Sequence, residues 1–440
     1  MEQINLDCLI LIFNIFEYDK KSLHSCLLVN KKWCNIVVPI LWRKYALQSI
    51  NEKHCNVLLS FLPYSSKKLL LDNDIKLPSS TLSKFPSFNY ISFCRFIYSG
   101  NIYRIIDIVQ CKNVKYLSWE TRQPLTLFPR ASIFFSQLHH LCIDIDFANS
   151  DAFYELANIC KDLNSLSVRS CSHNLSGLIY LIDAQRNLKE LNLNIEVDEK
   201  TGKELSKALV RNGTTINILC LNSIDNIVLS SFAKLDNLKK LKINCWKNHK
   251  EIQDLVNYRF PNLQYLELYS HLPSYKEISL LIEKVINISE IYIVNTNKTA
   301  KETGILIKAI ADNYPKINLL YTFIEPKDFI HVKTLLLNCR FLKTIGLESL
   351  EYSMNKNDNN IGDELLNIFI LFSSKFLDEI FISGLWKYSI NTFIQFFESF
   401  RGRSLYYFGI IDGNNYITDD HKSIIKKYID EGVVRLTYES

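Results

Sequence analysis

The sequence predicts an α/β solenoid, with a parallel β-sheet on the concave face, helices outside, and a small helical module in front. Three observations predict it. A short apolar pattern returns about every 25 residues, and predicted strands alternate with amphipathic stretches. Gly and Pro, at 12 and 10 of 440 residues, are too few to mark flexible linkers. An apolar fraction of 48% and a charged fraction of 22% exclude collagen and wholesale disorder.

The repeating pattern is L-x-x-L-x-L, with Ile, Val or Phe allowed at the apolar places. Its first positions are Phe88, Val114, Leu138, Leu163, Leu188, Ile216, Leu238, Leu263, Ile288, Ile317, Leu342, Leu377, Leu405 and Val433. The thirteen gaps between them run from 22 to 35 residues, and five equal 25. This period fits leucine-rich repeats, whose coils bury their apolar sides only against neighbouring coils. We therefore expect a horseshoe of about 14 degenerate coils over residues 88–440.

Helical stretches are expected between the strands. They are Asp151–Lys161, Lys203–Arg211, Lys276–Ile286, Lys301–Tyr314, Lys327–Cys339, Asp363–Phe376 and Asp419–Ile429. The Asn or Cys usual after the third apolar place is mostly missing, although Cys171 fits it, so the coils are degenerate. Residues 46–87 are expected to hold a linking helix, Glu52–Leu62, and an atypical first coil at Leu69–Leu71. The longest gap contains residues 352–362, which we expect to form an exposed loop.

Residues 2–45 form a different unit. Leu9, Ile12, Phe13 and Phe16 have helical spacing, and two further short apolar stretches follow a polar break at 17–22. Three short helices bury too little surface to form a stable domain alone. They form either a cap on the larger domain or a docking module that uses exposed apolar residues to bind a partner.

The stretch L-D-C-L-I-L-I-F, followed by V-N-K-K-W-C and P-I-L-W, resembles an F-box. Ile4 and Asn5 stand where that family often has Leu-Pro. The resemblance implies docking on a Skp-type adaptor and, through it, on the cullin and RING subunits of a ubiquitin ligase. The adaptor contacts that it implies are Leu9, Ile12, Phe13, Leu27, Leu28, Pro39 and Trp42. Trp42, like Trp33, has a rival role as core of the module.

Composition and motifs argue against other classes of function. The net charge of +5 is too small to indicate nucleic-acid binding, and the basic group Lys239, Lys240 and Lys242 beside Trp246 is expected to be a solvated face. No catalytic or phosphate-binding motif occurs, and the twelve cysteines include no C-x-x-C. Adjacent His139 and His140 would face opposite sides of a strand, and no oxyanion site accompanies Cys142. We expect no enzymatic activity, no metal and no cofactor.

The N-terminus has the wrong flanking charges for a signal peptide, and its apolar run, Cys8–Phe13, is far shorter than a membrane span. The sequence therefore predicts a protein of the cytoplasm or nucleus, with reduced cysteines and no membrane contact.

Strand alternation predicts one binding surface. If Leu191 and Leu193 point inward, the equivalent register downstream points aromatic and acidic residues to the concave side. The predicted target-binding residues are Tyr265, Glu267, Tyr269, Tyr292, Tyr321 and Phe323. Large amphipathic rings anchor many protein interfaces. Tyr is also abundant, with 23 in the chain, so exposure of several could be coincidental.

The sequence thus predicts the substrate-recognition subunit of an SCF-type ubiquitin ligase, in which the F-box holds the adaptor and the solenoid holds a target protein. Two alternatives stay open. One is a leucine-rich-repeat scaffold that never joins a ligase, and the other is a solenoid enzyme or nucleic-acid binder, against which the missing motifs and small net charge argue.

Overall fold

The computed structural model describes residues 5–44, 68, 87–88, 90–93, 95–98, 115–119, 135–144, 150–169, 175–222, 226–245, 255–297, 299–350, 360–403, 405–411 and 416–439. The predictions for Glu52–Leu62, Leu69–Leu71, Cys171 and residues 352–359 lie outside this set. The chain divides into two compact units, Met1–Ile195 and Glu196–Ser440, each of which is described by itself.

The first unit begins with three helices, as the sequence predicts. They are α1 (Leu6–Ile15), α2 (Lys20–Leu27) and α3 (Lys31–Lys44), with the 3₁₀ turn η1 (Phe16–Tyr18) after α1. A side-chain oxygen accepts a backbone N–H bond at each helix start: Asn5 from Asp7, Asp19 from Ser22, and Asn30 from Trp33. The three helices bury a core of their own, which consists of Leu9, Phe13, Leu23, Ile36, Val37, Ile40 and Leu41.

Five parallel strands follow in the first unit, each paired with the next along the chain. They are β1 (Phe96–Tyr98), β2 (Tyr116–Trp119), β3 (His140–Asp144), β4 (Ser165–Arg169) and β5 (Glu190–Asn194), with α7 (Ser150–Ile159) and α8 (Ser176–Asp183) between the later ones. The prediction of a strand at Phe88 is wrong. That pattern falls on the 3₁₀ turn η2 (Tyr90–Phe93), and the first strand, β1, comes after it.

The second unit continues the same alternation. Its strands are β6 (Ile218–Asn222), β7 (Lys240–Cys245), β8 (Tyr265–Ser270), β9 (Glu290–Asn295), β10 (Leu319–Phe323), β11 (Thr344–Glu348), β12 (Glu379–Ser383), β13 (Leu405–Ile411) and β14 (Val434–Glu439). Its helices are α9 (Glu199–Arg211), η7 (Leu229–Lys234), α11 (Lys276–Ile282), α12 (Thr303–Asn313), η8 (Pro326–Asp328), α13 (Phe329–Asn338), α14 (Ile361–Phe372), α15 (Ile390–Glu398) and α16 (Asp419–Asp430).

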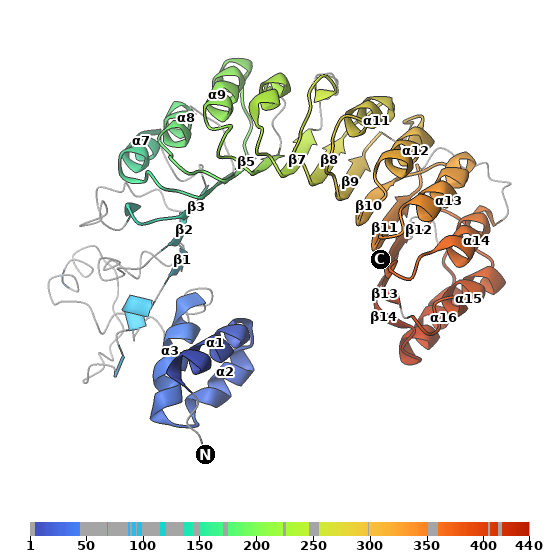
Figure 1. Ribbon diagram of the computed structural model, residues 1–440, viewed down its shortest axis with the longest axis horizontal. Coiled ribbons are helices and arrows are strands. Elements are labelled where there is room, and N and C mark those ends of the chain that lie inside the picture. Colours follow the sequence, from blue (N-terminus) through green and yellow to red (C-terminus); the bar gives the residue numbers. More distant parts are fainter. Residues whose placement is uncertain are drawn as a thin grey trace. The chain divides into compact units, whose positions relative to one another are not determined.

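Every described strand pair in the second unit is parallel, and the helices lie on the side away from the inner face of the curved sheet (Figure 1). Along β5, β8 and β9 alternate residues are buried, as the apolar pattern predicts. The fold is therefore the expected α/β solenoid of leucine-rich-repeat type. The predicted register of the last strand, β14, is wrong. The pattern points Leu436 inward, but Leu436 pairs with the outward Tyr407 and is exposed, while Val434 is buried.

Polar side chains join successive coils where the strands begin. The amide of Asn237 donates to the carbonyl of Thr214 (2.7 Å). Asn262 donates in the same way to Asp236 (2.8 Å), and Asn287 to Pro261 (2.8 Å). Buried thiols do likewise, since Cys160 donates to Phe135 and Cys339 to Tyr314. The amide bonds satisfy backbone carbonyls outside the strand ladder, whereas the carbonyls of Phe135 and Tyr314 also accept from the N–H groups of Leu138 and Ile317.

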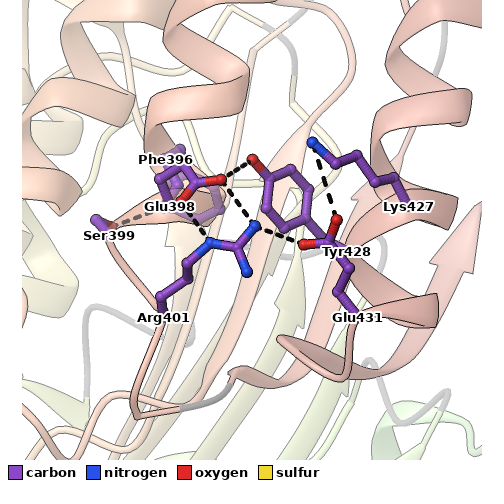
Figure 2. A network of polar contacts seen from close by, with 7 residues as sticks. All are labelled: Phe396, Glu398, Ser399, Arg401, Lys427, Tyr428 and Glu431. Atoms are coloured by element: carbon purple, nitrogen blue, oxygen red, sulfur yellow. Dashed lines mark hydrogen bonds and ion pairs between the residues drawn. The ribbon is translucent and has the colours of Figure 1, made fainter.

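A polar network closes the C-terminal end of the second unit (Figure 2). The Glu398 carboxylate accepts hydrogen bonds from Arg401 (2.5 and 2.9 Å) and from the Tyr428 hydroxyl (2.6 Å). Arg401 also pairs with Glu431 at 2.5 Å. The Tyr428 ring also stacks on Phe397, with centroids 5.1 Å apart. The network therefore ties the end of α15 to α16.

Within the described segments, no helix has both the length and the apolarity needed to cross a membrane.

Candidate protein-binding surfaces

The helical module has an apolar surface that its own core does not use. Leu11 and Ile15 lie two residues beyond Leu9 and Phe13 respectively, which places them on nearly the opposite side of α1. Leu11 is 67% exposed and Ile15 is 78% exposed. A helix that is apolar all round is normally buried on all sides. This outer stripe of α1, Leu11 and Ile15, therefore indicates a surface that binds a partner.

Two of the predicted adaptor contacts belong to the core instead. Leu9 and Phe13 are buried, and the Phe13 ring packs edge-on against Trp33 with centroids 5.0 Å apart. Neither side chain is exposed in this conformation, and their direct contact with an adaptor stays a prediction. The motif could not distinguish the roles, because both sides of α1 carry Leu, Ile and Phe.

The other predicted adaptor residues divide between surface and interior. Ile12 is exposed, and Leu28, at the end of α2, is 88% exposed. Leu27 and Trp42 are partly buried against the module core, and Trp42 also packs on Tyr90 at a centroid distance of 4.4 Å. Pro39 lies inside α3 and is partly buried. Leu11, Ile15 and Val29 are exposed as well, and no sequence pattern singles them out, because their exposure becomes visible only once the core is known.

On the second unit, the six predicted target-binding residues all occupy outward positions of β8, β9 and β10 and are partly buried. Register puts Glu267 beside Tyr292, and Tyr292 beside Tyr321. Phe323 lies two residues beyond Tyr321 on the same side of β10, as alternation requires. The predicted surface is thus contiguous in the structure.

Aromatic rings form a row across these strands. Tyr292 and Tyr321 stack with centroids 4.2 Å apart and planes 14° apart, and Tyr269 lies 5.9 Å from Tyr292. The row continues through Phe381, 6.5 Å from Tyr321, to Tyr407, 4.8 Å from Phe381. We call these five residues the aromatic row. Rings fixed by their neighbours lose little entropy when a partner binds.

Two glycines make room for the row. Gly346 pairs in register with Tyr321 and Phe381, and a Cβ built at Gly346 would overlap the Tyr321 ring. A Cβ at Gly409 would lie 2.6 Å from the Phe381 ring. Each ring therefore folds over the backbone of the next strand, which no larger residue would permit.

Charged groups flank the row. Glu267 accepts a hydrogen bond from the Tyr265 hydroxyl and pairs with Lys242 at 2.5 Å. Lys240 lies over the Tyr265 ring, 4.1 Å from its centroid. The Tyr321 hydroxyl donates to Glu348, and burial raises the pKa of that carboxyl above its ordinary value. Burial, together with Tyr269 and the nearby Glu348 and Glu267, also raises the pKa of Tyr292.

Of the remaining candidates, Lys240 and Lys242 lie in β7 and His140 lies in β3. Lys240 and Lys242 engage Tyr265 and Glu267, and Trp246 lies outside the described residues. His140 is on the surface side of β3 while Cys142 is buried, and burial lowers the pKa of His140. Across the described ranges, no group of three or more His, Cys, Asp or Glu residues could hold a metal ion.

Neither a protein-family model nor a curated protein sequence matches the chain. Among solved structures, it is similar to an internalin of Listeria monocytogenes at 15% identity and a TM-score of 0.40, covering 74% of this chain and 91% of that one. It is also similar to the yeast Rad7 and Elc1 complex at 13% identity and a TM-score of 0.49, covering 100% of this chain and 96% of that one. Likeness at such identities concerns the fold alone.

Proposed function

We propose that the chain is an F-box and leucine-rich-repeat protein that acts as the substrate-recognition subunit of an SCF-type ubiquitin ligase. The helical module binds a Skp-type adaptor, which connects it to the cullin and RING subunits. The outward face of β8 to β12 binds the target protein. The observation that carries this proposal is the exposed apolar stripe of α1, within a module whose segment V-N-K-K-W-C…P-I-L-W resembles an F-box.

The mechanism is proximity. The receptor performs no bond chemistry of its own, and instead raises the effective concentration of target lysines near a ubiquitin-loaded enzyme. Such a role needs two separate binding surfaces and a stable framework for each. The chain offers an unpartnered apolar helix side in its first unit and a fixed aromatic row in its second.

Adaptor binding is the test of this proposal. The full chain is mixed with a purified Skp-type adaptor, and the affinity is measured by titration calorimetry. The double substitution Leu11→Asp and Ile15→Asp places charges on the α1 stripe but leaves Leu9 and Phe13 in the core. We expect binding to weaken by about 100-fold or more, because a charge replaces an apolar anchor at each position.

The control is Ile330→Asp, which charges another exposed isoleucine, on α13 of the second unit. It should bind the adaptor like the unaltered chain. If the unaltered chain fails to bind the adaptor, or if the α1 double variant binds as well as the Ile330 variant does, the ligase role is wrong and the chain is a scaffold outside such ligases.

A further inference from the structure

Glutamate and aromatic residues predominate at the outward positions of β8 to β12, and no lysine or arginine is among them. The acidic residues at these positions are Glu267, Glu290, Glu348 and Glu379. The chain as a whole carries a net charge of +5, so this face is opposite in sign to the average of the molecule. Such a local reversal favours a partner of positive charge.

Within the described part of the chain, two of the four carboxylates have a cationic partner. Lys242 pairs with Glu267, and Lys343 lies 3.7 Å from Glu379. Among the residues that the structure describes, no basic side chain pairs with Glu290 or Glu348. Two negative charges are therefore left on the same face as the aromatic row.

Both uncompensated carboxylates lie at the row itself. Glu348 accepts from Tyr321, and Glu290 is two residues before Tyr292 on the same side of β9. Stacking fixes the rings of Tyr292 and Tyr321, and the bond from Tyr321 holds the Glu348 carboxylate beside them, so that the phenol oxygens and Glu348 form a fixed set of hydrogen-bond acceptors that Glu290 extends. Arginine suits such a set, since its planar guanidinium donates to several oxygens at once and its stem packs on aromatic rings.

We propose that this face binds an arginine-rich segment of the target, with one guanidinium at Glu290 and another at Glu348. The inference rests on the proposed role of these strands as the target surface and names the class of target. Glu290 and Glu348 lie two strands and four residues apart in register, which is about 16 Å diagonally across the sheet. An extended peptide covers that distance in about five residues, so arginines spaced by about five should fit best.

The test uses fluorescein-labelled peptides and the full chain, with affinity read by anisotropy at about 0.1 M ionic strength. One peptide has four Arg-Gly repeats and its counterpart has four Glu-Gly repeats. Two further peptides carry two arginines, either adjacent or five residues apart. We expect the Arg-Gly peptide to bind at least about tenfold more tightly than the Glu-Gly peptide, and the spaced arginines more tightly than the adjacent ones.

Glu290→Gln and Glu348→Gln should each weaken Arg-Gly binding by about fivefold, since each removes one charge but keeps the side-chain size. Glu364→Gln, at an exposed position of α14, is the matched control and should leave binding unchanged. The inference is overturned if the Arg-Gly and Glu-Gly peptides bind equally well, or if Glu290→Gln and Glu348→Gln both bind the Arg-Gly peptide as tightly as the unaltered chain does. Adaptor affinity is measured on the same samples. If the full chain binds the Arg-Gly peptide but not the adaptor, only the ligase role is wrong. If it binds the adaptor but not the Arg-Gly peptide, only this inference is wrong.

Discussion

At the scale of single residues, the aromatic row depends on what its neighbours lack. Tyr321 can stack on Tyr292 because Gly346, the neighbour on the opposite side of the Tyr321 ring, has no side chain. The phenol is then held by its hydrogen bond to Glu348. Gly346 is thus a packing requirement of the row, set by space and not by an unusual backbone angle.

Gly346→Ala should consequently destabilise the protein by about 1–3 kcal/mol, because the new methyl group forces the Tyr321 ring out of the row. The free energy of unfolding from urea denaturation measures the cost. In a Tyr321→Ala background the same change removes no ring contact, and alanine is favoured over glycine in a strand. There we expect a neutral or stabilising effect.

A Gly346→Ala cost that is equal in the two backgrounds would mean that Tyr321 does not rest on this glycine. The double-mutant cycle isolates the pair, because each single change removes the same contact. Arg-Gly peptide affinity should fall together with stability in the unaltered background, since Tyr321 would no longer hold Glu348 in place.

At the scale of the element, the sequence predicts strands better than it predicts surfaces. The L-x-x-L-x-L pattern locates β2 to β13, because burial of alternate residues is what defines such a strand. It fails at Phe88, where apolar residues at the right spacing form the turn η2. It slips by one residue in β14, where adjacent Val433 and Val434 both satisfy the first apolar place.

The Asn that recurs before β7, β8 and β9 illustrates what a pattern can and cannot reveal. N-L-K-K-L and N-L-Q-Y-L repeat visibly in the sequence, yet the reason is a bond to a residue about 25 positions earlier. Likewise, the sequence predicts the outward residues of β8 to β10 from alternation alone, but not the stacking of Tyr292 on Tyr321. Stacking depends on the register between coils, which only the assembled sheet fixes.

The C-terminal network of α15 and α16 predicts a specific dependence of stability on pH. Hydrogen bonds from Arg401 and Tyr428 lower the pKa of Glu398 to about 2, from an ordinary value of 4.5. A carboxyl whose pKa is lower in the folded state stabilises the fold fully above its unfolded pKa. This stabilisation should therefore be complete above about pH 4.5 and be lost as the pH falls toward about 2.

The measurement is the difference in unfolding free energy between the unaltered chain and Glu398→Gln as the pH is lowered from 7 to 2. We expect this difference to be largest at neutral pH and to shrink as the pH falls from about 4.5 to about 2. Protonation of Glu398 removes the same negative charge that the substitution removes. Glu364→Gln, on the exposed side of α14, should show no such convergence. A difference that is constant with pH would show that the Glu398 charge does not stabilise this end of the unit.

At the scale of the whole molecule, the two proposed surfaces belong to different compact units. The α1 stripe is supported by the small core around Leu23 and Val37. The aromatic row is supported by strands β8 to β13 and the leucine and isoleucine side chains beneath them. No residue contributes to both supports, so each surface can change without altering the framework of the other.

Substitutions on the two surfaces should therefore act independently. A chain that carries Leu11→Asp and Ile15→Asp together with Glu290→Gln and Glu348→Gln should lose adaptor affinity as the first pair does alone and Arg-Gly affinity as the second pair does alone. The effects of substitutions that share no contacting residues add within about 0.5 kcal/mol, a factor of about two in affinity. Adaptor affinity is measured by calorimetry and peptide affinity by anisotropy. Each is measured first without the other ligand and then with the other ligand at saturation. A larger departure in either would mean that adaptor docking and target capture are coupled, so that the receptor would itself sense whether it is loaded.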